Sequence, residues 1–177
     1  MLIKQINRHI QTPIIFIEIK LDILEYKDIL ISEIEKGILE NSNMNFKTHI
    51  KGKMTSFKYF KDNYYFRKIL NKAFSKIEVF QEIPEALLQD AWGFKIEEGN
   101  KTTMHSHFEN IYSGILYLST NKLPLMFPDL KLEIEPKEGT FLLFSGLLKH
   151  GTYKNNYPEP KYAIAFNFIE KKGWVDS

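Results

Sequence analysis

The first half of the chain combines one short apolar run with two segments of helical periodicity. The apolar residues of 13–19 are dense enough to predict a β-strand. From 22 to about 39 the period changes to that of an amphipathic helix, and Asp22 with Glu25 three residues later is a suitable helix start. Its apolar positions share one face: Ile23, Leu30, Ile34 and Ile38. A second helix is predicted over 62–76.

The second half of the chain changes to the alternation of half-buried strands. Trp92, Phe94 and Ile96 alternate with smaller or charged residues. Further apolar runs follow at 111–118, 130–134, 140–144 and 162–168, separated by turn-forming residues. Short strands in regular succession favour a sandwich or barrel. The pattern therefore predicts an α+β, mainly β fold, in which N-terminal helices pack on one face of an antiparallel barrel.

The length of the chain fits one domain. With 177 residues it can bury a substantial core, and no repeat or linker divides it. We expect a single domain over 1–177, with a helical layer at about 20–85 and a barrel core at about 86–170. The net charge of +2 and the scattered lysines give no clear sign of a nucleic-acid partner. The N-terminal apolar run is too short to span a membrane and contains Glu18, so we expect a cytoplasmic protein.

The absence of cysteine restricts the chemistry. It excludes disulfides, a thiolate nucleophile and cysteine-based metal sites, so a metal would be held by His, Asp or Glu. Among the five histidines, His105, His107 and His150 fall at the ends of predicted strands. Residues two apart in an extended segment project to the same side, which puts His105, His107 and Glu109 on one face.

Not all of these side chains can bind one ion comfortably. From His105 to Glu109 an extended backbone runs about 13 Å, at about 3.3 Å per residue. Either His105 with His107, or His107 with Glu109, forms a reasonable pair, and His150 would complete it. The first set is a three-histidine site, and the second is the two-histidine, one-carboxylate set of many Fe(II) oxygenases. Surface histidines and a cupin metal site are also compatible with this pattern.

Several segments together resemble a known family. Residues 92–118 carry Trp92, Gly99, His105-Ser-His107 and Ser113-Gly-Ile-Leu-Tyr-Leu118, in the order W…G…H-x-H…S-G-x-x-Y. Residues 135–167 carry a P-x-x-G segment, Leu143-Phe-Ser145, His150 and Lys161-Tyr-Ala-Ile-Ala-Phe-Asn167. This combination resembles the 2-oxoglutarate/Fe(II)-dependent oxygenases of bacteria and phages, over about 50 to 168 of the chain.

The resemblance implies a double-stranded β-helix, a jelly-roll or cupin-like barrel, that binds Fe(II) and 2-oxoglutarate. The metal and catalytic residues that it implies are His105, His107 and His150, with Glu109 as the alternative third ligand. Lys161 occupies the position of the basic residue that holds the distal carboxylate of 2-oxoglutarate. The family usually has Arg there, and Lys keeps the charge but loses the bidentate fork. Ser145 also departs from the family, which tends to have Pro.

The resemblance also implies an activity, in which O₂ and 2-oxoglutarate are consumed and an unidentified substrate is hydroxylated. Tyr117 and Ser113 are candidate contacts to the co-substrate, although buried structural roles are also open to both. Trp92 is expected to pack in the core, and Asn167 to bond the backbone. The alternatives are a cupin-like metal-binding protein or dioxygenase that does not use 2-oxoglutarate, and a barrel without metal or activity.

Overall fold

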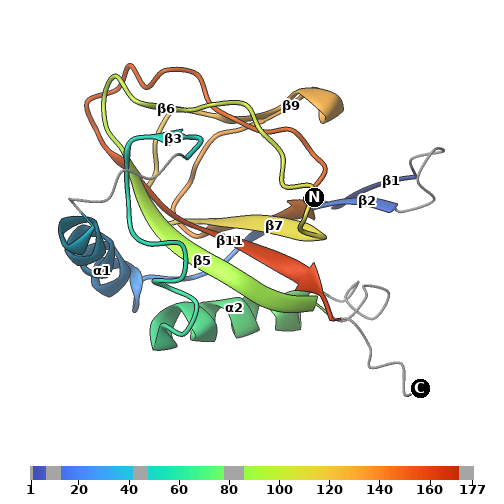
Figure 1. Ribbon diagram of the computed structural model, residues 1–177, viewed down its shortest axis with the longest axis horizontal. Coiled ribbons are helices and arrows are strands. Elements are labelled where there is room, and N and C mark those ends of the chain that lie inside the picture. The colour runs from blue at the N-terminus through green and yellow to red at the C-terminus, as the bar shows by residue number, and fades with distance from the viewer. Residues whose placement is uncertain (1, 7–12, 42–47, 78–85, 172–177) are drawn as a thin grey trace.

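The computed structural model describes residues 2–6, 13–41, 48–77 and 86–171 and shows a large antiparallel sheet with helices on one face (Figure 1). His9 lies outside the described residues. The elements are β1 (Leu2–Ile6), β2 (Pro13–Lys20), α1 (Lys27–Glu40), β3 (Ile50–Lys51), β4 (Lys53–Met54), α2 (Tyr64–Lys76), β5 (Ala86–Ile96), β6 (Lys101–Thr102), β7 (Tyr112–Tyr117), β8 (Leu125–Phe127), the 3₁₀ turn η2 (Pro128–Leu130), β9 (Leu132–Ile134), β10 (Thr140–Ser145) and β11 (Lys161–Glu170).

The large sheet has seven strands in the order β1-β2-β10-β7-β11-β5-β4. Its neighbouring strands all pair antiparallel. Two short strand pairs, β3-β6 and β8-β9, lie over the face opposite the helices (Figure 1). The predicted mainly β barrel with helices on one face is therefore confirmed.

The helices form where the apolar stripes predict them, but both begin later than predicted. Helix α1 begins at Lys27, because the Asp22 carboxylate accepts a hydrogen bond from Leu24 N at 3.2 Å and residues 24–26 form a turn. The side chain of Asn63 caps α2 by accepting from Phe66 N at 3.0 Å. Gly93 of β5 lets α1 approach the sheet, since a Cβ there would lie 2.3 Å from Ile34 Cγ1.

The strand predictions hold in kind but not in every boundary. Strand β5 begins at Ala86, six residues before the alternation that starts at Trp92. Leu130, expected in a strand, ends the 3₁₀ turn, and the following strand begins at Leu132. Strands β1 and β8 were not predicted, and β3 and β4 lie inside the expected helical layer. Neither described helix is long and apolar enough to span a membrane, and the cytoplasmic location stays a prediction.

The alternation along β11 assigns the two faces of the sheet. Ile164, Phe166 and Phe168 belong to the core under the helices. Ala163 and Ala165 belong to the other apolar cluster, toward the short strand pairs. Since side chains alternate along a strand, Lys161 and Asn167 face this second side. The second side of the sheet is where the candidate site lies.

Candidate functional site

Two loops bring the three barrel histidines together. His105 and His107 lie in the segment between β6 and β7, and His150 follows β10. The backbones of His105 and His150 exchange two hydrogen bonds: His105 N donates to His150 O at 3.0 Å, and His150 N donates to His105 O at 2.8 Å. Residues 45 positions apart are thus held as a β-bridge, which fixes the spacing of the two side chains.

His107 is held by a close backbone approach. Its N–H donates to Gly146 O at 2.7 Å, and Gly146 N donates to Ile111 O at 3.0 Å. A Cβ at position 146 would lie 2.1 Å from Asn110 O, which leaves room only for glycine. The loop after β10 therefore positions His107 as well as His150.

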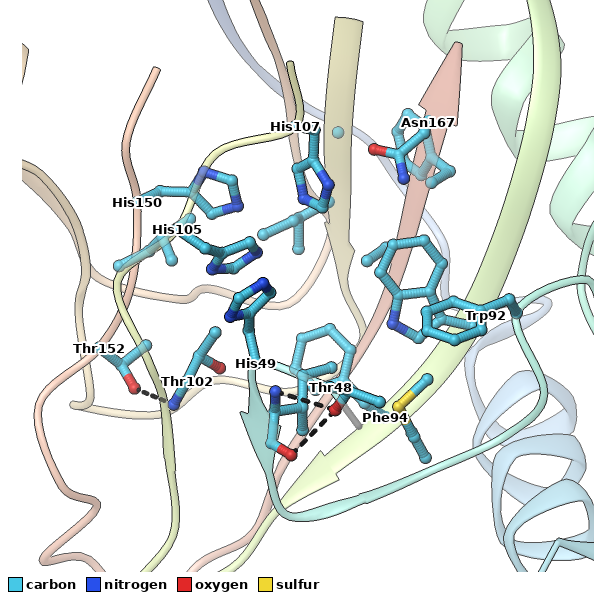
Figure 2. A pocket seen from close by; sticks show the side chains of 18 of the residues that line it. Thr48, His49, Trp92, Phe94, Thr102, His105, His107, His150, Thr152 and Asn167 are labelled. Carbon is cyan, nitrogen blue, oxygen red and sulfur yellow. Dashed lines mark hydrogen bonds between the residues drawn. The ribbon is translucent and has the colours of Figure 1, made fainter. Parts of the chain in front are cut away.

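The three imidazoles converge on one point (Figure 2). One nitrogen from each of His105, His107 and His150 lies within 4.8 Å of the others. Nitrogens bound to one ion at about 2.1 Å lie no more than about 4.2 Å apart, so a small rotation of the rings brings all three into range. Among the residues that the structure describes, these three form the one group with metal-ligand spacing.

Backbone carbonyls select the tautomer of two of these rings. His105 Nδ1 lies 2.8 Å from Thr103 O, and His150 Nδ1 lies 3.0 Å from Leu148 O. A carbonyl oxygen only accepts, so Nδ1 carries the proton in both rings and Nε2 keeps its lone pair. Such second contacts are typical of metal-binding histidines, because they orient the ring and raise its basicity.

Burial keeps the three imidazoles neutral. It lowers the pKa of His107 to about 4 and that of His150 to about 3, and it also lowers the pKa of His105. Repulsion among the rings acts in the same direction. Three uncharged nitrogen donors at neutral pH match what a divalent transition-metal ion requires.

Glu109 is not brought to this group. It lies in a turn, is exposed, and does not belong to the group with metal-ligand spacing. The chain leaves its extended path after His107, so the alternation assumed for residues 105–109 ends there. The structure thus assembles the three-histidine alternative and not the pair of His107 with Glu109.

The same cavity holds a buried lysine without a counter-charge. Lys161 is 1% exposed and lines the cavity with the three histidines. Burial alone lowers the pKa of its ammonium to about 7, and no described carboxylate lies within ion-pairing distance. Its Nζ lies 5.9 Å from the centre of the Tyr117 ring, and the Tyr117 hydroxyl is buried without a hydrogen-bond partner. Unpaired buried polar groups are costly, so Lys161 and Tyr117 are candidate contacts for a ligand in this cavity.

Ser113 has contacts that fit the buried structural role left open for it. Its hydroxyl donates to Asn167 Oδ1 at 2.6 Å, and Ser113 does not line the cavity. Asn167 was expected to bond the backbone, but its Nδ2 instead donates to the Asp90 carboxylate at 3.0 Å. These three residues form a side-chain chain across β7, β11 and β5.

Two residues of the cavity were not predicted as site residues. The ring of His49 stacks on that of His105, with centroids 4.3 Å apart and planes 11° apart. His49 precedes the two-residue strand β3, which is too short to be predicted from the sequence, so its place in the cavity could not be predicted either. Trp92 was expected to pack in the core, but it lines the cavity and its Nε1 is buried without a partner. The alternation of Trp92 with Phe94 and Ile96 assigns its face of the sheet, but not its polar role.

No family model and no curated protein sequence matches this chain. Solved structures do. The viral collagen prolyl hydroxylase of Paramecium bursaria Chlorella virus-1, in complex with 2-oxoglutarate, is 17% identical, covers 86% of this chain and 94% of its own, and has a TM-score of 0.68. The prolyl-4-hydroxylase of Pseudomonas putida is 12% identical, covers 88% of this chain and 92% of its own, and has a TM-score of 0.63. HygX of Streptomyces hygroscopicus, with nickel and 2-oxoglutarate bound, is 12% identical, covers 89% of this chain and 83% of its own, and has a TM-score of 0.64.

These similarities extend over most of each chain at low sequence identity. The chain therefore has the double-stranded β-helix fold of the 2-oxoglutarate-dependent oxygenases.

Proposed function

We propose that this protein is an Fe(II)- and 2-oxoglutarate-dependent oxygenase that hydroxylates a substrate not yet identified. The observation that carries the proposal is a single cavity lined by a three-histidine group and by Lys161, a buried lysine that no described carboxylate pairs with. The structural neighbours, some of which hold 2-oxoglutarate in the same fold, support it.

The histidines fit Fe(II). His105, His107 and His150 would hold the ion through imidazole nitrogens and leave further positions open for co-substrate and oxygen. Because all three donors are neutral, they would leave the full 2+ charge of the ion uncompensated, which favours an anionic chelator. When bound, Fe(II) and 2-oxoglutarate supply the oxidation of a C–H bond by O₂, with succinate and CO₂ as co-products.

The other residues of the cavity fit a dicarboxylate. The Lys161 ammonium would pair with the distal carboxylate, and the Tyr117 hydroxyl would donate a hydrogen bond to a ligand oxygen. The apolar side chains around them, such as Ile115 and Phe144, exclude water and so strengthen both contacts. A metal site without 2-oxoglutarate would leave the buried Lys161 without a partner, which is why the oxygenase is preferred over the cupin-like alternative.

The proposal is tested by an anaerobic titration of metal-free protein with Fe(II) and then with 2-oxoglutarate. We expect stoichiometric iron binding, followed by a visible metal-to-ligand charge-transfer band that saturates at one 2-oxoglutarate per protein. Iron binding without this band would contradict the use of 2-oxoglutarate and leave a cupin-like metal protein. Failure to bind iron would contradict the metal site itself.

Binding of 2-oxoglutarate is expected to take up a proton above neutral pH. With a pKa of about 7, Lys161 is mostly uncharged at pH 8 in the free protein, and a bound carboxylate would raise this pKa again. At pH 8 the metal-loaded protein should therefore take up close to one proton per ligand, and at pH 6 much less. Affinity should fall as the pH rises through 7.

Calorimetry in pairs of buffers with different ionisation enthalpies measures this uptake, and the same protein at pH 6 is the control. A heat of binding at pH 8 that is independent of the buffer would contradict the pairing of Lys161 with the ligand.

A further inference from the structure

The floor of the cavity has two polar ends. On β11 the residues that face the cavity side are Lys161, Ala163, Ala165 and Asn167. At about 3.3 Å per residue, the six steps from Lys161 to Asn167 span about 20 Å. The small side chains of the two alanines between them leave room in the cavity above the strand. One end carries the Lys161 amine, and the other carries the Asn167 amide.

The end away from Lys161 is a hydrogen-bonded row across three strands. The register places Asn167 opposite Ser113 of β7 and Asp90 of β5. Ser113 Oγ donates to Asn167 Oδ1 at 2.6 Å, and Asn167 Nδ2 donates to Asp90 Oδ1 at 3.0 Å. This row holds the Asn167 amide in one orientation, and the half-buried Asp90 carboxylate lies behind it, outside the residues that line the cavity.

The Trp92 indole, next to this row on the same face of the sheet, has a hydrogen-bond donor without a partner. Trp92 pairs with Ala165 in the register, is 6% exposed, and its Nε1–H is buried without a partner. The exposed ring of Phe57 meets the Trp92 ring edge-on at 5.3 Å, and both line the cavity. Figure 2 shows Trp92 and Asn167 on the side of the cavity away from His150. A buried N–H that no protein group satisfies points to a ligand that does.

We propose that Trp92, Asn167 and Phe57 form the subsite for the primary substrate, and that it takes an uncharged, largely apolar group whose carbonyl or hydroxyl oxygen accepts from Trp92 Nε1. This proposal rests on the proposed function, because it assigns the other end of the cavity to the co-substrate. The Asp90 carboxylate behind Asn167 disfavours an anion here. The aromatic walls favour an apolar body.

The test follows the Trp92 indole resonance of ¹⁵N-labelled protein that is loaded with Zn(II) and saturated with 2-oxoglutarate. The chain has two tryptophans, and Trp92→Phe assigns the resonance. The probe is cyclohexanone, and its matched control is methylenecyclohexane, which has the same shape without the oxygen. Cyclohexanone should move the Trp92 N–H downfield in a saturable way and bind about fivefold more tightly than the hydrocarbon, as one hydrogen bond predicts. In Trp92→Phe the two probes should bind equally.

A charged probe tests the role of Asp90. Cyclohexanecarboxylate should bind native protein at least about tenfold more weakly than cyclohexanone, because the Asp90 charge repels it. Asp90→Asn should remove most of this difference, and its amide oxygen still accepts from Asn167 Nδ2. This variant keeps the test open if Trp92→Phe does not fold.

The subsite is overturned if the Trp92 resonance reaches its final position with 2-oxoglutarate alone, or if both uncharged probes bind native protein equally. Failure of the proposed function is distinguishable from this. If Fe(II) and 2-oxoglutarate form no charge-transfer band but cyclohexanone still shifts Trp92, the oxygenase proposal fails and the pocket for an oxygen-bearing apolar group stands.

Discussion

Replacing His107 with alanine is expected to weaken Fe(II) binding at least about a hundredfold and to abolish the charge-transfer band and any turnover. Binding energies of about 10–16 kcal/mol for four-ligand protein metal sites correspond to about 2.5–4 kcal/mol per ligand. The backbone N–H of His107 donates to Gly146 O, and this hydrogen bond holds the segment in place. The substitution removes the imidazole ligand but keeps this backbone hydrogen bond. Thermal unfolding of the metal-free variant should therefore stay close to that of native protein.

The matched control is Glu109→Ala, two residues further along the same loop. Its side chain is exposed and outside the histidine group, so its metal affinity should equal that of native protein. His105→Ala should behave like His107→Ala. If Glu109→Ala loses iron and His105→Ala retains it, the site is the two-histidine, one-carboxylate alternative and the three-histidine assignment is wrong.

Replacing Lys161 with methionine is expected to weaken 2-oxoglutarate binding about a hundredfold while leaving Fe(II) binding intact. Loss of one partner of a buried charge pair typically costs about 2–5 kcal/mol, a factor of about 30 to several thousand in affinity. Methionine matches the length and volume of the lysine stem, so the packing around position 161 is retained. Calorimetric titration of the metal-loaded variant measures the loss, and Lys154→Met, at an exposed position, is the control.

The ligand-free Lys161→Met protein should also be more stable than native protein, because a buried charge without a partner is removed. The sign depends on pH in a defined way. Since the native pKa of about 7 lies below the ordinary value of 10.5, the unfolded chain binds more protons between these values and native stability rises with pH there. The advantage of the variant in urea unfolding should therefore be largest at pH 7 and below and shrink toward pH 10. Weak 2-oxoglutarate binding combined with lower stability would indicate a damaged fold instead of a lost contact.

Much of the fold follows from local sequence. The stripe of Ile34 and its neighbours predicted α1, and the alternation from Trp92 predicted β5, because the side-chain periods of helix and strand differ. The errors are also local. Asp22 bonds Leu24 N and forms a turn, which delays the helix to Lys27, and β8 is only three residues long, too short for a period to be recognised.

The sequence by itself determined the chemistry that is available: no cysteine, a His-x-His pair, a distant third histidine, and a lysine eleven residues after it. It left the third ligand open, because alternation fits both His105 and Glu109 only while the strand continues. Only the tertiary structure places His105 beside His150 and leaves Glu109 outside the group, since the backbone bridge between His105 and His150 joins segments 45 residues apart and the chain turns before Glu109. The identity of the third ligand stays a prediction. The pairing of β5, β7 and β11 likewise put Trp92, Asn167 and Lys161 in one cavity. Burial and the lack of partners, which arise only when distant strands pack, turn an ordinary lysine and tryptophan into candidate binding groups.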